Sequence, residues 1–103
     1  MNPDASIDMS KRDRIIIHAT RLAAKIGYRD LTRAEVATAA NVATGTVSYH
    51  FGTLEALQDA IVEHAVQHEV LAVVAQALAD NHKAAVDAPA ALKQRAARYL
   101  AAR

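Results

Sequence analysis

The fold is decided by residues 31–57, which read LTRAEVATAANVATGTVSYHFGTLEAL. Thr32 and Glu35 stand at the spacing of a capping box, so a helix is expected to begin just after Thr32 and to cover about 33–40. A second short helix is expected over about 44–50, after a turn of three residues. Two short helices at this spacing are typical of a helix-turn-helix, in which the second helix enters the DNA major groove.

Outward from this stretch the sequence favours helix throughout. It contains only three glycines and two prolines, and apolar residues recur at three- and four-residue steps. Further helices are expected over about 11–26, 54–80 and 89–101, and residues 82–88 fit either a loop or a continued helix. The predicted fold class is all-α, with a three-helix helix-turn-helix domain followed by a long helix and a short C-terminal helix.

The second half of the expected long helix is apolar on more than one face. A single packed neighbour does not need so wide an apolar surface, and a chain of 103 residues lies near the lower size limit for an independent core. We therefore expect a homodimer. The residues expected at its interface are Val70, Leu71, Val73, Val74 and Leu78. The chain is predicted to divide into a disordered tail (1–9), a helix-turn-helix domain (10–52) and a helical dimerisation region (53–103).

Charge is segregated along the chain although the net charge is only +1. Residues 9–52 carry seven basic and three acidic residues, a balance of +4. Residues 53–81 carry five acidic residues and no Lys or Arg, whereas residues 82–103 return to +4. The N-terminal half is thus the part that a polyanion would prefer, although solvated helix faces would show the same charges.

The second helix of the motif has an unusual composition. Only Val47 and Phe51 are apolar at an i, i+4 step, so they are expected to face the core. Hydroxyl groups and an imidazole are then left outside, where they suit phosphate oxygens and base edges. These outward residues are Thr44, Thr46, Ser48, Tyr49 and His50. The alternative interpretation is a polar, solvent-facing turn between two longer helices.

These residues carry a resemblance to a known family. LT at 31–32, EVA at 35–37 and ANVATGTVSYHFGTLEAL at 40–57 resemble the signature of the DNA-binding domain of the tetracycline-repressor (TetR) family, and the likeness extends over about 11–68. The resemblance implies a homodimeric transcription regulator, usually a repressor, that binds a palindromic operator in double-stranded DNA.

The resemblance also implies roles for individual residues. Thr44, Gly45 and Thr46 would lie nearest the base edges, and Tyr49 and His50 would hold phosphates. The start of the preceding helix would meet the DNA backbone through its dipole and a cation. Three basic residues of the first helix are added on charge alone. The full predicted DNA-binding set is Lys11, Arg12, Arg14, Thr32, Arg33, Thr44, Gly45, Thr46, Ser48, Tyr49 and His50.

The sequence departs from the family pattern in several places. Asn41 replaces the family's turn glycine, Ala43 its N-cap serine, and Leu54 a lysine that commonly meets a phosphate. Loss of a cap costs about 1 kcal/mol, and each lost phosphate contact flattens the salt dependence of binding by about one unit. The family's ligand-binding module is also longer than residues 53–103, so no small-molecule effector is expected. The region is expected to form a four-helix arrangement with its mate.

No catalytic or cofactor chemistry is predicted. Without cysteine there is no disulfide, thiolate zinc site or cysteine nucleophile, and no paired carboxylates, Ser-His-Asp set or glycine-rich phosphate loop is recognisable. His64 and His68 at i, i+4 could bind zinc or nickel, but we interpret them as solvent- or interface-facing. The expectation is a non-enzyme without metal or cofactor, not bound to a membrane, located in the cytoplasm of a bacterium at its nucleoid and encoded there or by a phage.

The leading hypothesis is therefore a small dimeric repressor that acts by occupying an operator. A protein-interaction module, working as an anti-repressor or adaptor on the same scaffold, is the alternative, and Ala43 and Leu54 favour it slightly. A nonspecific DNA-coating protein is a third possibility, and it would show steep salt dependence without operator preference.

Overall fold

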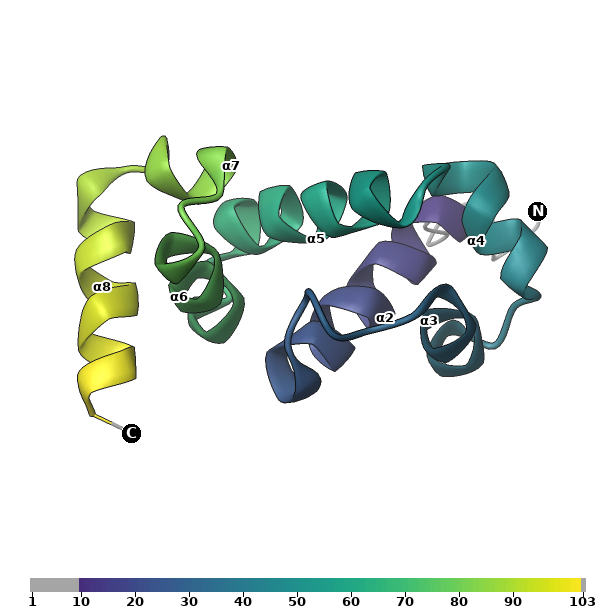
Figure 1. Ribbon diagram of the computed structural model, residues 1–103, viewed down its shortest axis with the longest axis horizontal. Coiled ribbons are helices and arrows are strands. Elements are labelled where there is room, and N and C mark those ends of the chain that lie inside the picture. Colours follow the sequence, from purple (N-terminus) through teal and green to yellow (C-terminus); the bar gives the residue numbers. More distant parts are fainter. Residues whose placement is uncertain (1–9, 103) are drawn as a thin grey trace, which may run out of the picture.

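A computed structural model describes residues 10–102, and in this part of the chain it is all-α (Figure 1). The helices are α2 (Lys11–Ile26), α3 (Arg33–Ala40), α4 (Thr44–Phe51), α5 (Leu54–His68), α6 (Leu71–Ala79), α7 (Lys83–Val86) and α8 (Ala90–Ala101). The expected tail over residues 1–9 lies outside the described residues. None of the described helices is both long and apolar enough to cross a membrane.

The ends of the first helices are set by local hydrogen bonds, as predicted. Ser10 caps α2 by accepting from the backbone N–H of Asp13. The capping box of α3 is complete, because Thr32 Oγ1 accepts from the Glu35 N–H at 3.1 Å and the Glu35 carboxylate accepts from the Thr32 N–H at 2.9 Å. Asn41 then takes the left-handed conformation with φ of 58°, which turns the chain into α4.

The core of the N-terminal half joins α2, α3, α4 and α5. Ile15, Val36, Val47, Leu57 and Ile61 are fully buried, one or two from each of these helices. Because every one of the four helices contributes to this core, α4 is held in a fixed orientation although it is only eight residues long.

The prediction of a single long helix over 54–80 is wrong. The chain breaks at Glu69, which adopts the left-handed conformation with φ of 57° and ψ of 45°, and Val70 donates its N–H back to Ala65 at 2.9 Å. The carboxylate of Glu69 accepts from Arg95 of α8 at 2.6 Å. The break lets α6 turn back and pack along α8 (Figure 1).

The expectation that a partner chain must cover the apolar residues after residue 69 is wrong. Val73 and Val74 are fully buried inside the chain itself, so no partner is needed to cover them. The apolar surplus of the sequence is satisfied by α8, whose Leu92 and Ala96 are also buried. The other three predicted interface residues, Val70, Leu71 and Leu78, are half-buried against the same core.

Residues 82–88, which fit either a loop or a continued helix in the sequence, contain the short helix α7. His82 Nδ1 caps α7 by accepting from the Ala84 N–H at 3.1 Å. Its other ring nitrogen pairs with Asp59 of α5 at 2.8 Å. Pro89 then directly precedes α8, which places the start of the last helix close to the expected position.

A polar cluster connects the end of α2 to α6. Gln76 accepts from the Tyr28 backbone N–H at 3.0 Å and donates to the Ala23 carbonyl at 3.2 Å. The Tyr28 hydroxyl donates to Asp80 at 2.8 Å, and Arg29 Nε pairs with the same carboxylate at 2.9 Å. These hydrogen bonds attach the helix-turn-helix half to the α6–α8 half.

Removing the Tyr28 hydroxyl should weaken this connection. Tyr28 is 2% exposed, so Tyr28→Phe is expected to lower the free energy of unfolding by about 1.5–3 kcal/mol, the range for a hydrogen bond to a charged group. Burial, and then the Asp80 carboxylate, raise the pKa of Tyr28 above its usual 10.0.

The raised pKa sets the sign of a pH effect. The protonated tyrosine stabilises the fold fully below pH 10, and this contribution is lost as the pH rises through the raised pKa. Denaturant unfolding of the wild type, Tyr28→Phe and the control Tyr99→Phe at pH 7 and above pH 10 measures both effects. An alkaline loss of equal size in the wild type and Tyr28→Phe would contradict the assignment to Tyr28.

Candidate nucleic-acid interface

The orientation of α4 is the central feature of the candidate site. Val47 and Phe51 face the core with exposed fractions of 0% and 7%, whereas Tyr49 is 84% exposed. Thr44 is exposed as well, and Thr46, Ser48 and His50 are half-buried. The Tyr49 and His50 rings meet edge to face with centroids 5.0 Å apart. The predicted polar face of this helix is therefore on the surface.

The start of α4 has no side-chain cap. Ala43 occupies the N-cap position with φ of −73° and offers only its carbonyl, which accepts from the N–H groups of Thr46 and Val47. Thr44 is already the first helical residue, so it does not serve as the N-cap in place of Ala43. The leading amides of α4 thus remain for an outside acceptor such as a phosphate oxygen.

Gly45 lies in this first turn beside open space. A Cβ placed on it would meet no atom within 4 Å. The fold therefore does not require glycine at this position. A glycine keeps the backbone accessible to a surface that approaches α4 closely.

The start of α3 lies beside the end of α4. Thr32 is exposed, although its hydroxyl already serves the capping box. Arg33 is half-buried, and its Nη1 donates to the carbonyl of Gly52 at 3.3 Å. Arg33 thus helps to hold the end of α4 in place, a role that its charge alone does not predict.

The basic residues at the start of α2 differ from one another in their contacts. Lys11 is exposed. The Arg12 guanidinium lies over the Phe51 ring, 4.6 Å from its centroid. Arg14 is half-buried and donates to the Ala40 carbonyl at 3.2 Å. Arg12 and Arg14 thus contact α4 and α3, although Arg12, like Lys11, is exposed.

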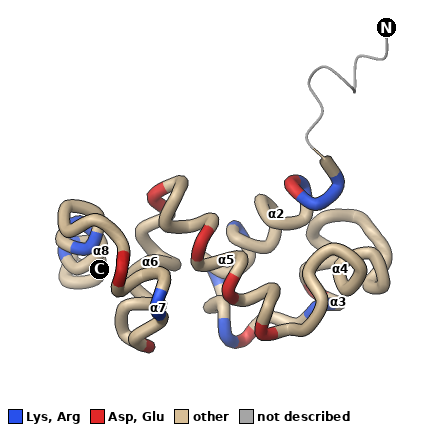
Figure 2. Tube along the Cα trace, turned by 90° about the horizontal axis from the view of Figure 1, so that it is seen from above, with Lys and Arg blue, Asp and Glu red and all other residues tan. Residues whose placement is uncertain are grey.

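The charge pattern of the sequence survives in three dimensions. Figure 2 shows basic residues at the start of α2 and on α8, and acidic residues along α5. The acidic side chains of α5 are those of Glu55, Asp59 and Glu63. An approaching polyanion would meet less repulsion over the starts of α2, α3 and α4 than over this acidic face of α5.

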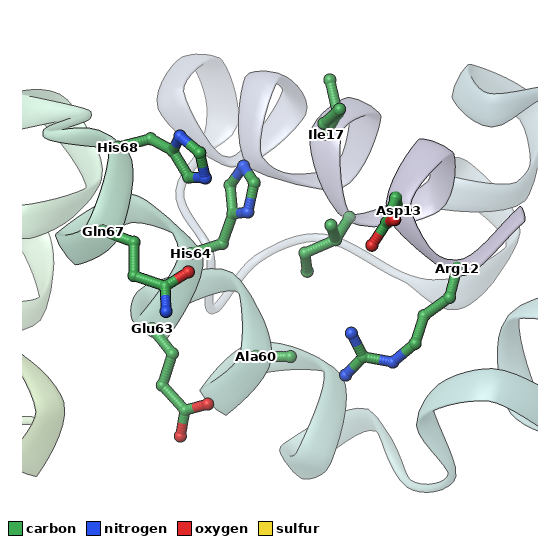
Figure 3. Close-up of a pocket in the computed structure, with 9 residues that line it drawn as sticks. Arg12, Asp13, Ile17, Ala60, Glu63, His64, Gln67 and His68 are labelled. Atoms are coloured by element: carbon green, nitrogen blue, oxygen red, sulfur yellow. The ribbon is translucent and has the colours of Figure 1, made fainter. Parts of the chain in front are cut away.

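A pocket of about 460 Å³ lies between α2 and α5 (Figure 3). Its polar lining residues are Arg12, Asp13, Glu63, His64, Gln67 and His68. Burial lowers the pKa of His64 first, the neighbouring His68 lowers it further, and Asp13 acts in the opposite direction. No local sequence pattern indicates this pocket, because α2 and α5 meet only in the fold.

Comparison with known proteins supports the assignment of these helices. Residues 15–61 match the family model described as bacterial regulatory proteins, tetR family. This stretch includes most of α2, all of α3 and α4, and the first half of α5. No curated protein and no solved structure matches the chain. Residues 15–61 are therefore a helix-turn-helix domain of the TetR type, the DNA-binding domain of a family of bacterial transcription regulators.

Proposed function

We propose that the protein is a homodimeric repressor that acts by occupying a palindromic operator. The observation that carries this proposal is the surface of α4, where an exposed Tyr49, an uncapped first turn and an open Gly45 stand together. Each subunit would place α4 in a major groove, with half-sites about one turn of DNA apart or somewhat more.

The predicted contacts divide into two kinds. Thr44, Gly45 and Thr46 would approach base edges at the start of α4. Tyr49 and His50, together with Thr32 at the start of α3, would contact the phosphate backbone and fix the register. In this proposal α4 is the recognition helix, and Arg12, Arg14 and Arg33 act chiefly by holding α3 and α4 in place. Each of them already contacts α3, α4 or the residue that ends α4.

Residues 53–103 are proposed to form the dimerisation region. Val86, Tyr99 and Leu100 are 43%, 38% and 50% exposed, and Leu71 and Leu78 are half-buried. A mate that covers these residues would complete a four-helix arrangement. Close packing of α6 on α8 supports a regulator that works without the family's usual ligand pocket.

A fluorescence-anisotropy titration tests operator binding. The purified protein is added to the DNA upstream of its own gene and to a shuffled duplex, at two salt concentrations. Saturable binding to the first duplex only, with two chains per duplex, is the expected result. Tyr49→Ala should weaken this binding by about tenfold or more, a loss of about 1.4 kcal/mol, because it removes a proposed phosphate contact. The fold should be unaffected, because the Tyr49 side chain touches little besides His50.

Ile26→Ala is the matched control, since it removes another exposed apolar side chain, at the end of α2 and outside both the DNA-binding set and the dimerisation region. It should leave the affinity unchanged. Equal, salt-sensitive binding to both duplexes would overturn the operator proposal in favour of nonspecific coating. Absence of binding to either duplex, with a folded protein, would favour the adaptor alternative.

A further inference from the structure

A pair of histidines stands apart from the recognition helix at one end of the α2–α5 pocket. His64 and His68 are one helical turn apart near the end of α5, and their ring centroids are separated by 4.2 Å at a tilt of 33°. Figure 3 shows the two rings facing each other. His64 is half-buried and His68 is exposed, so one ring is fixed by its surroundings and the other can adjust to a ligand.

The surroundings of the pair favour a cation. Asp13 of α2 and Glu63 of α5 line the same pocket, and the last turn of a helix carries partial negative charge. Arg12, the cation among the lining residues, lies toward the other end of the pocket over the Phe51 ring (Figure 3). The pocket also has room for an ion with several bound waters.

We propose that His64 and His68 bind a late first-row divalent cation, with Cu²⁺ preferred over Ni²⁺ and Zn²⁺. Two imidazoles at i, i+4 on one helix face are an established arrangement for such ions, and imidazole affinity is highest for Cu²⁺. Within residues 10–102 no group of three or more metal-ligating side chains is assembled. Water therefore fills the remaining positions, and Asp13 stabilises the bound charge across the pocket.

Two features separate this inference from the spacing alone. Residues four apart share a helix face whatever their side chains do, whereas here the two rings lie together, with centroids 4.2 Å apart, at the edge of a pocket. Helix α2 also contributes a carboxylate, that of Asp13, to the same pocket. This assignment goes beyond operator binding and does not depend on it.

Copper titration of the metal-free, untagged full chain tests the proposal. Isothermal titration calorimetry measures the affinity and the number of ions bound. The visible absorption band of Cu²⁺ bound to nitrogen is the second readout. One ion per chain is expected, together with a copper-dependent rise in Tm, because an ion that binds the folded chain stabilises it. His64→Gln and His68→Gln should each weaken binding by about tenfold or more, since each removes one of two ligands.

His18→Gln is the matched control, because His18 is a half-buried histidine on α2 outside the pair. It should leave the affinity unchanged. His68→Gln changes an exposed side chain, so it keeps the test valid even if His64→Gln disturbs the fold. The site would be ruled out by copper affinity that survives both pair variants, by a loss of equal size in His18→Gln, or by no binding to the wild type.

Discussion

Gly45→Glu is expected to weaken operator binding by about 100-fold while leaving the fold at least as stable as the wild type. The substitution would place a carboxylate in the first turn of α4, the part proposed to lie nearest the DNA. Juxtaposed like charges cost several kcal/mol at an interface, and about 2.7 kcal/mol corresponds to 100-fold in affinity. Anisotropy with the operator duplex measures the loss.

The stability of this variant should change in the opposite direction. A Cβ at position 45 meets no atom within 4 Å, so the new side chain has room. Glu is a better helix former than Gly by roughly 0.5–1 kcal/mol, and an acidic group at a helix N-terminus gains typically about 0.3–1 kcal/mol from the dipole. Thermal unfolding should therefore show a Tm equal to or above that of the wild type.

Ala91→Glu provides a closely matched control. Ala91 is the second residue of α8 and is exposed, as Gly45 is the second residue of α4, and neither helix has a side-chain cap. Ala91→Glu should share the dipole gain but not the helix-propensity gain, because Ala is already the best helix former, and it should lose no DNA affinity beyond a small effect of net charge. Equal loss of affinity in the two variants would show that net charge, rather than the surface of α4, governs binding.

The helix-turn-helix half of the fold could be predicted from the sequence because its boundaries are encoded locally. Ser10, Thr32 and Thr53 cap helices through hydrogen bonds to residues three positions ahead. Asn41 and Gly27 end helices with positive φ, a conformation that both residue types tolerate. A local signal of this kind depends on no distant contact, so the sequence alone carries it.

The break at Glu69 had no such signal. Glutamate rarely adopts a left-handed conformation, and here it is held between the end of α5 and Arg95, a residue 26 positions away. The surplus of apolar residues after it has two physical solutions, a second chain or a fold-back. Hydrophobic periodicity does not distinguish between them, because both bury the same side chains.

The candidate site could be predicted only in part, for a related reason. The outward face of α4 follows from the i, i+4 step of Val47 and Phe51, and their burial agrees with it. The roles of Arg12 and Arg14 do not follow, since sequence assigns both only a positive charge. Their contacts with Phe51 and with the Ala40 carbonyl arise from tertiary packing of α2 on α3 and α4.

Val74→Ala distinguishes the two solutions for the apolar segment. Val74 is fully buried within the chain, so the variant should lower the free energy of unfolding by about 2 kcal/mol through lost burial and a new cavity. It should leave the dissociation constant of the proposed dimer unchanged. Leu71→Ala, at a half-buried position of the same helix, should instead weaken the proposed dimer.

Denaturant unfolding measures the first quantity for both variants, and sedimentation equilibrium of the folded proteins measures the second. Val74→Ala would contradict the fold-back if it raised the dimer dissociation constant tenfold or more with little change in stability. That outcome would mean that α6 faces a partner rather than α8, as the extended helix predicted from the sequence requires. A stability loss without a change in association means that α6 and α8 form a core within each chain. Dimerisation would then involve only the outer residues of this region.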